Sequence, residues 1–319
     1  MASLSAQEIS GLCQSWIDAT PSKGRGYQRR QQVDRSAEDF RLLRNGVVFA
    51  DLDYGQLRAA AVGLTTVLLR PGLTMHLNGD HRWFWAWSTE LLCGSASTYF
   101  KGWPEQELQN LLGLCCRAAL AGTYPPDDEG ARRQIERSLS MEHNAGRFVE
   151  EATSVLTYLA FPLLEAMAKK HCTEYVSMGG GVIQRFTAGP AGREYNVGET
   201  CSNVRDLLWL VNDNCSTDEL RHDLGEVRAH LKGLAIGDED GFDVIFRWRN
   251  SSLHGVESLP TVGGTVLNVA LLIALSEIRD RYEAMRALAL TQVQEEAQGV
   301  GASGLGDSRS PLSFYPPYV

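Results

Sequence analysis

Residues 216–234 read STDELRHDLGEVRAHLKGL and carry the clearest amphipathic pattern in the chain. Their apolar side chains recur at steps of four and three residues, at Leu220, Leu224, Val227, Leu231 and Leu234. This spacing places them on one face of an α-helix. Ser216 and Glu219 have the spacing of a capping box, which predicts that the helix begins there. The stretch therefore predicts a helix packed against an apolar core.

Helical patterns also lie on both sides of this stretch. Residues 148–167 repeat apolar side chains at three- and four-residue steps, and Pro162 is expected to kink that helix. A further pattern from Val266 to Met285 predicts one long last helix. Between them, residues 173–202 contain Gly179-Gly180-Gly181 and two short extended runs, which predict a small inserted β-hairpin.

The N-terminal third has a more mixed pattern. Ser5 to Glu8 form a capping box that predicts a short helix through Trp16, and residues 57–69 and 106–121 predict two more helices. Val47 to Phe49 predict a short strand or a buried segment. We therefore expect a mainly α protein: a C-terminal helical bundle with a small β-hairpin, preceded by a mixed or mostly helical region.

Clusters of residues that interrupt helices predict where the chain divides into domains. Residues 124–130, YPPDDEG, are rich in residues that interrupt helices. We place a boundary there, between an N-terminal region of unknown fold at 1–123 and a helical domain at 131–297. Residues 298–319 turn to Gly, Ser and Pro and are expected to form a disordered tail.

Composition excludes several classes of protein. The chain has 319 residues, of which 44% are hydrophobic and 22% are charged, so it can bury a sizeable core. Its formal net charge of −9 gives no overall basic surface for nucleic acid, although a local basic groove stays compatible with it. We see no secretory signal and no run of about 20 apolar residues that would span a bilayer, so no membrane partner is expected and cytoplasmic is the default location.

The seven cysteines show no Cys-x-x-Cys pair and no spacing typical of a zinc site. We expect them to be reduced and buried, and we expect no cofactor and no metal. The chain also lacks the motifs of phosphate-binding loops, dinucleotide-binding folds, zinc proteases and esterases.

One segment combines polar side chains in a pattern that favours chemistry. Residues 246–255 read FRWRNSSLHG between two helices with apolar faces. Burial of so many polar groups is costly unless they pair with one another or with a ligand. Arg249 and His254 are five residues apart, which separates them by about 140° on a regular α-helix. They converge only if the segment bends, begins as a loop, or meets a second copy across a dimer axis.

Arg249, Asn250 and His254 together resemble the motif of the HEPN superfamily. That motif is an arginine, often followed by a polar residue, then a histidine after four to six residues. The resemblance implies a helical bundle that dimerises with its two motifs facing each other. It also implies metal-independent cleavage of RNA: the ribose 2′-hydroxyl is the nucleophile, and a cyclic phosphate and a 5′-hydroxyl are the products. His254 would move protons, Arg249 would stabilise charge on the phosphate and Asn250 would support either.

Two other interpretations of the same residues stay open. A HEPN-like fold is the alternative as a non-catalytic module that binds RNA or nucleotides or that assembles into a dimer. A helical protein unrelated to HEPN would use Arg249 and His254 in a buried polar network. An active site predicts that both side chains line an open cleft, whereas a scaffold predicts that they are buried and hydrogen-bonded. Family members often act in toxin–antitoxin or antiviral defence, so an inhibitor or antitoxin protein is a further expected partner by analogy.

Weaker candidates lie elsewhere in the chain. Arg137 and His143 repeat the arginine–histidine spacing in a polar stretch. His76, Asp80 and His81 are a conceivable metal site, although such close spacing is more typical of an exposed loop. Trp83, Phe84, Trp85 and Trp87 would suit base stacking or, more simply, a half-buried strand. Arg29 and Arg30 would suit phosphate contacts or a solvated surface.

Overall fold

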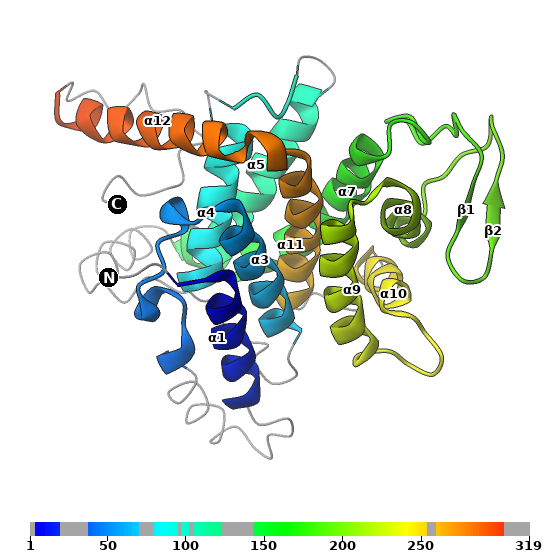
Figure 1. The fold of residues 1–319 in the computed structure, drawn as a ribbon, viewed down its shortest axis with the longest axis horizontal. Helices are drawn as coiled ribbons and strands as arrows, with labels where there is room; N and C mark the ends of the chain where they lie inside the picture. The colour runs from blue at the N-terminus through cyan, green and yellow to red at the C-terminus, as the bar shows by residue number, and fades with distance from the viewer. Residues whose placement is uncertain are drawn as a thin grey trace.

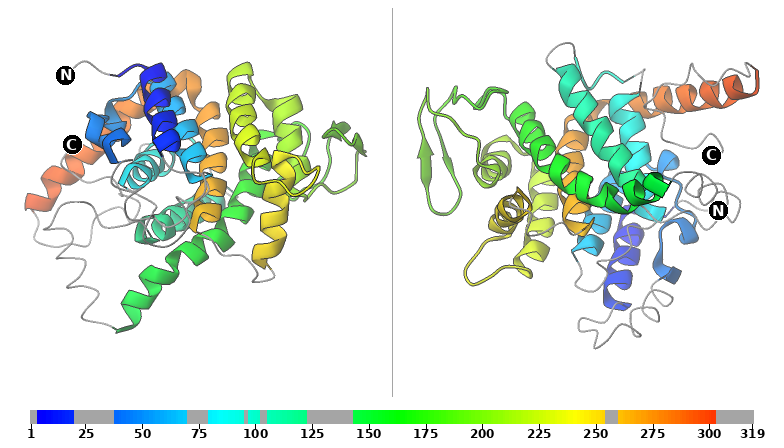
Figure 2. Two further views of the ribbon diagram at one scale, coloured as in Figure 1. Left: turned by 90° about the horizontal axis from the view of Figure 1, so that it is seen from below. Right: turned by 180° about the vertical axis from the view of Figure 1, so that it is seen from behind.

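The structure is a computed structural model that describes residues 4–19, 38–69, 79–94, 97–101, 105–122, 143–253 and 260–302. Within these ranges the chain is mainly helical with one small antiparallel hairpin, which confirms the expected fold class. The predicted insertion contains strands β1 (Phe186–Ala188) and β2 (Arg193–Tyr195), with Phe186 opposite Tyr195. The hairpin stands off one end of the molecule (Figures 1 and 2).

Helix α11 (Pro260–Glu277) is the centre of the bundle (Figure 1). Every side chain from Thr261 to Leu275 is buried, whichever way it points. A helix that is apolar on all sides has to be covered on all sides. Its cover comes from α3 (Tyr54–Leu68), α4 (Gly79–Cys93), α5 (Glu105–Gly122), α7 (His143–His171) and α9 (Asp218–Lys232).

One hydrophobic core includes helices from both sides of residues 124–130, where the sequence predicts a domain boundary. Helix α5 packs along α7, and α3 packs on both α9 and α11. One cluster of buried side chains extends from Ile9 to Val293. The division into 1–123 and 131–297 stays a prediction about sequence organisation, since the described helices of both parts share this core.

Several helix ends follow from side-chain caps. Helix α1 (Ala6–Ala19) begins where predicted, because Ser5 Oγ accepts from the Glu8 backbone N–H and the Glu8 carboxylate accepts from the Ser5 backbone N–H. Helix α9 begins one residue later than predicted. Its cap is Thr217, which accepts from the Leu220 N–H, while Ser216 Oγ donates to the Val211 carbonyl.

The prediction of one long last helix is wrong. Helix α11 ends at Glu277, the short turn η5 (Arg279–Arg281) follows, and α12 (Tyr282–Ala302) leaves at an angle of 64°. The bend is fixed by tertiary contacts, because Tyr282 Oη donates to the Leu52 carbonyl at 2.7 Å. Since α12 continues to Ala302, residues 298–302 belong to a helix rather than to the predicted tail, and residues 303–319 lie outside the described part.

Helix α10 (Gly241–Leu253) carries the described part of the predicted motif and packs on α7, α9 and α8 (Val204–Leu210). Helix α8 runs into a π-helical turn, η4 (Val211–Cys215). Short 3-10 turns at Glu38–Phe40, Leu43–Asn45 and Phe49–Asp51 connect α1 to α3, so the 47–49 segment is buried but not a strand.

No single described helix is both long enough and apolar enough to cross a bilayer. Among the described helices, the bent pair Thr261–Glu277 and Arg279–Glu295 is long and apolar enough for a membrane span only when the two helices are taken together.

An ion pair joins the N-terminal helices to the C-terminal ones, and it gives a test of the shared core. Arg58 on α3 donates to both carboxylate oxygens of Asp223 on α9, from Nε at 2.6 Å and from Nη2 at 2.8 Å. Arg58→Met leaves the buried Asp223 carboxylate without its partner, so we expect the free energy of unfolding to fall by about 3 kcal/mol. Urea denaturation measures this loss.

The double variant Arg58→Met/Asp223→Leu should recover most of that stability, because no unpaired charge remains. Arg185→Met, which breaks the exposed pair with Glu194, is the control and should change stability little. An Arg58→Met protein as stable as the wild type would contradict the proposed link between the two parts.

Candidate functional site

Arg249 and Asn250 lie in the last turns of α10, on a helix that is regular through Leu253. Arg249 Nε donates to Glu165 Oε1 on α7 at 2.7 Å. The two side chains are 29% and 16% exposed, so the pair lies at the edge of the core. Asn250 is half-buried and makes no side-chain hydrogen bond to a described residue. The ion pair fixes the arginine against α7.

The other end of the Arg249 guanidinium is uncommitted. Its bond to Glu165 uses Nε, and neither Nη group has a partner among the residues that the structure describes. A guanidinium carries five N–H donors, and its Nη edge suits a phosphate. Arg249 is therefore held in place on one edge and available on the other.

His254 lies outside the described residues, which stop at Leu253 and resume at Pro260. The described helix brings Arg249 together with Asn250 and Glu165. It leaves open how His254 lies relative to them, so convergence of Arg249 and His254 stays a prediction.

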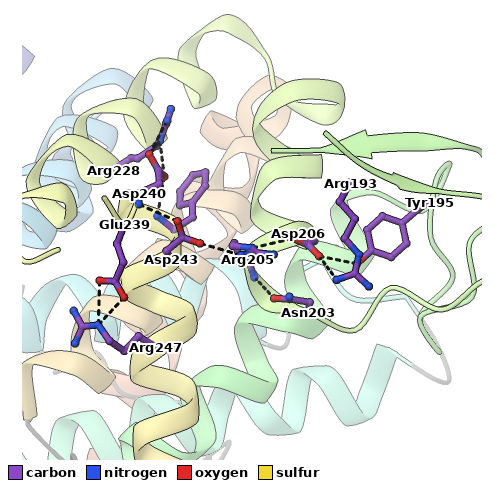
Figure 3. Close-up of polar contacts among 11 residues, drawn as sticks. Arg193, Tyr195, Asn203, Arg205, Asp206, Arg228, Glu239, Asp240, Asp243 and Arg247 are labelled. Atoms are coloured by element: carbon purple, nitrogen blue, oxygen red, sulfur yellow. Dashed lines mark hydrogen bonds and ion pairs between the residues drawn. The ribbon is translucent and has the colours of Figure 1, made fainter. Parts of the chain in front are cut away.

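A network of arginines and carboxylates extends from the β-hairpin to α10 (Figure 3). At its centre is Asp206 on α8, which is almost fully buried. It accepts from Tyr195 Oη at 2.7 Å, Arg205 Nε at 3.0 Å and Arg193 Nη1 at 3.2 Å. Three donors offset the cost of burying this carboxylate. Asp206 therefore fixes the hairpin to α8.

The same network continues into α9 and α10. Arg205 Nη1 donates to Asp243 on α10 at 3.2 Å, and Arg228 on α9 donates to both oxygens of Asp240. The Arg228 guanidinium also lies over the Trp209 ring at 4.2 Å, and Arg247 on α10 pairs with Glu239. These arginines are bound by carboxylates of their own chain, so we assign them to positioning α10 and not to ligand binding.

Sequence reasoning missed both Glu165 and the Asp206 network. Glu165 is 84 residues away from Arg249 along the chain and looks like one more polar position on an amphipathic helix. No spacing rule connects it to the motif, because the contact exists only once α7 and α10 pack together. The partners of Asp206 lie nearer in sequence, at Arg193, Tyr195 and Arg205, but no motif distinguishes them from other polar residues.

The candidate metal site does not form from the residues that are described. Asp80 accepts from the backbone N–H groups of Leu42 and Leu43, at 2.9 and 3.2 Å. His81 Nε2 donates to the Leu64 carbonyl at 2.9 Å. Both side chains are buried and engaged with the backbone, and no group of metal ligands occurs in the described ranges; His76 lies outside them.

The aromatic segment of the N-terminal third is described by the structure, whereas most of the other weaker candidates are not. The tryptophan-rich segment is helix α4, not a strand, and Phe84, Trp85 and Trp87 are buried in the core, which removes them from base stacking. His143 begins α7, but Arg137 lies outside the described residues, as do Arg29 and Arg30. Their proposed contacts stay untested.

The chain matches no known protein-family model, no curated protein and no solved structure. The resemblance to HEPN therefore stays a prediction from the motif residues.

Two buried groups at the start of α4 give opposite pH dependences. Burial lowers the pKa of His81 from 6.5 to about 4. Between these values the unfolded chain binds the extra proton, so stability decreases as the pH falls. Burial raises the pKa of the Asp80 carboxyl from 3.8 to about 6, so there the folded chain binds the extra proton and stability increases as the pH falls. Each contribution is about 3 kcal/mol.

We therefore expect His81→Gln to remove this loss of stability in acid. As the pH falls from 6.5 to 4.5, the stability of the variant should rise relative to that of the wild type. Asp80→Asn should do the reverse and make the protein more sensitive to acid. Urea unfolding across this range measures both slopes, with the exposed His222→Gln as control. Parallel pH profiles for His81→Gln and the wild type would show that His81 is not held neutral by burial.

Proposed function

We propose that this protein is a metal-independent endoribonuclease of HEPN type, acting as a cytoplasmic homodimer. The observation that carries the proposal is the state of Arg249, anchored to Glu165 through Nε with its Nη edge free and partly exposed. An arginine that is already oriented loses little freedom when it binds a phosphate.

In the proposed reaction the ribose 2′-hydroxyl attacks the adjacent phosphorus and the 5′-oxygen leaves. His254 transfers the proton, Arg249 stabilises the charge that develops on the non-bridging oxygens and Asn250 orients one of these groups. The products are a 2′,3′-cyclic phosphate and a 5′-hydroxyl. By analogy with HEPN proteins, the activity would serve toxin–antitoxin or antiviral defence and would be restrained by an inhibitor or antitoxin protein.

A second candidate is a non-catalytic module that binds RNA or nucleotides or assembles into a dimer. The ion pair between Arg249 and Glu165 favours it too, because the pair joins α10 to α7 at the edge of the core. In this function the motif arginine stabilises the bundle, and its loss lowers stability without affecting any reaction. The two candidates differ in what their variants do to RNA.

Cleavage of a mixed RNA pool with EDTA present tests the proposal. We expect the wild-type protein to produce fragments with cyclic phosphate ends, and we expect Arg249→Ala and His254→Ala to reduce cutting by at least about a hundredfold. Thermal unfolding verifies that both variants are folded, and light scattering measures the proposed dimer. Cutting that persists in both variants would exclude this site, and no cutting by any protein would favour the assembly module.

Glu165 provides a matched pair of variants. Glu165→Gln keeps an oxygen that accepts from Arg249 Nε but loses the charge, so cleavage should persist. Glu165→Ala removes the anchor, so kcat should fall about tenfold or more with a smaller change in KM, because the arginine is no longer oriented. Equal activity of the two variants would show that the anchor does not matter to the reaction.

A further inference from the structure

Two cysteines meet where α7 ends. Cys172 directly follows α7, and Cys215 is the last residue of the π-helical turn η4. His171 Nε2 donates to the Cys215 carbonyl at 3.2 Å, and its Nδ1 lies 3.2 Å from Glu277 Oε1 on α11. These contacts hold the η4 turn against the end of α7, and the side chains of Cys172 and Cys215 are neighbours there.

The two thiols have different surroundings. Cys172 is buried, whereas Cys215 is partly exposed; the other five cysteines are buried. The proximity of the two thiols lowers the pKa of Cys215 and raises that of Cys172. Burial and the negative charge of Glu277 raise the pKa of Cys172 further. The accessible sulfur is thus the better nucleophile, and the buried one is its neighbour.

The turn that carries Cys215 is itself unusual. π-helical turns are rare and often occur at functional sites. Here the turn ends α8 and presents Cys215 at the surface beside the end of α7. Cys201 lies near Cys172 as well, but it is buried, and burial raises its pKa.

We propose that Cys172 and Cys215 form a reversible thiol–disulfide site whose co-reactant is a small-molecule disulfide such as oxidised glutathione. The Cys215 thiolate, having lost its proton to solvent, attacks one sulfur of the small disulfide. A mixed disulfide forms, and one small thiolate leaves and takes up a proton. Cys172 then loses its proton to solvent and attacks the Cys215 sulfur. The Cys172–Cys215 bond forms and the second small thiolate leaves, so two protein thiols are oxidised and one small disulfide is reduced to two thiols.

Peptide mapping tests the site directly. Trypsin separates the three cysteines, because Cys172, Cys201 and Cys215 fall in residues 171–185, 194–205 and 206–221. The full-length protein is equilibrated with oxidised glutathione, free thiols are alkylated and the peptides are identified by mass spectrometry. We expect a cross-link between 171–185 and 206–221 that a reductant removes. Any other pairing, or none, would overturn the proposal.

Variants separate the two roles. In Cys172→Ser the mixed disulfide should accumulate on 206–221, because the resolving thiol is gone, and in Cys215→Ser neither product should form. Cys201→Ser is the matched control and should behave like the wild type. Alkylation of the folded wild-type protein provides a measurement that needs no variant: Cys215 should react about tenfold faster than any other cysteine. Equal reactivity of Cys215 and the buried cysteines would overturn the proposal.

Discussion

The burial of α11 on all sides from Thr261 to Leu275 is the constraint on which the remaining arrangement depends. An apolar helix with no polar face gains stability only if neighbours cover it all round, and here they come from both ends of the chain. Its approach to α7 is especially close. A side chain at Gly263 would place its Cβ 2.8 Å from the Thr157 backbone nitrogen, so only glycine fits there. Because α10 precedes α11, this packing also determines where Arg249 meets α7.

The helices could be predicted from sequence wherever one face is apolar and the other polar. The patterns at 148–167 and 216–234 led to the correct elements for this reason, and the hairpin followed from its glycines. Periodicity failed where burial is complete. In α4 the alternation of Trp83, Phe84, Trp85 and Trp87 is typical of a strand, yet a helix buried on most sides accepts any order of large side chains. The break after Glu277 was likewise hidden, because it depends on contacts of Tyr282 with the distant residue Leu52.

The candidate site was also only partly predictable from the sequence. Arg249 and Asn250 stood out from their local spacing. The partner of Arg249 could not be derived, since Glu165 reaches it only when α7 and α10 pack together. The cysteines show this most clearly. Nothing in their positions along the chain separates Cys215 from the other six, yet Cys215 is partly exposed in the structure and the others are buried.

The shared cover of α11 has a consequence for how this protein can vary in evolution or be divided in the laboratory. A fragment that begins after residue 130 would keep the motif and the hairpin but would expose the side of α11 that α3, α4 and α5 cover, together with the carboxylate that Arg58 neutralises. The N-terminal helices therefore belong to the same hydrophobic core as the helices that carry the motif. Recombination that replaces the N-terminal third would have to supply an apolar surface of matching shape. A protein shortened for structural work would expose an apolar patch and would be prone to aggregate.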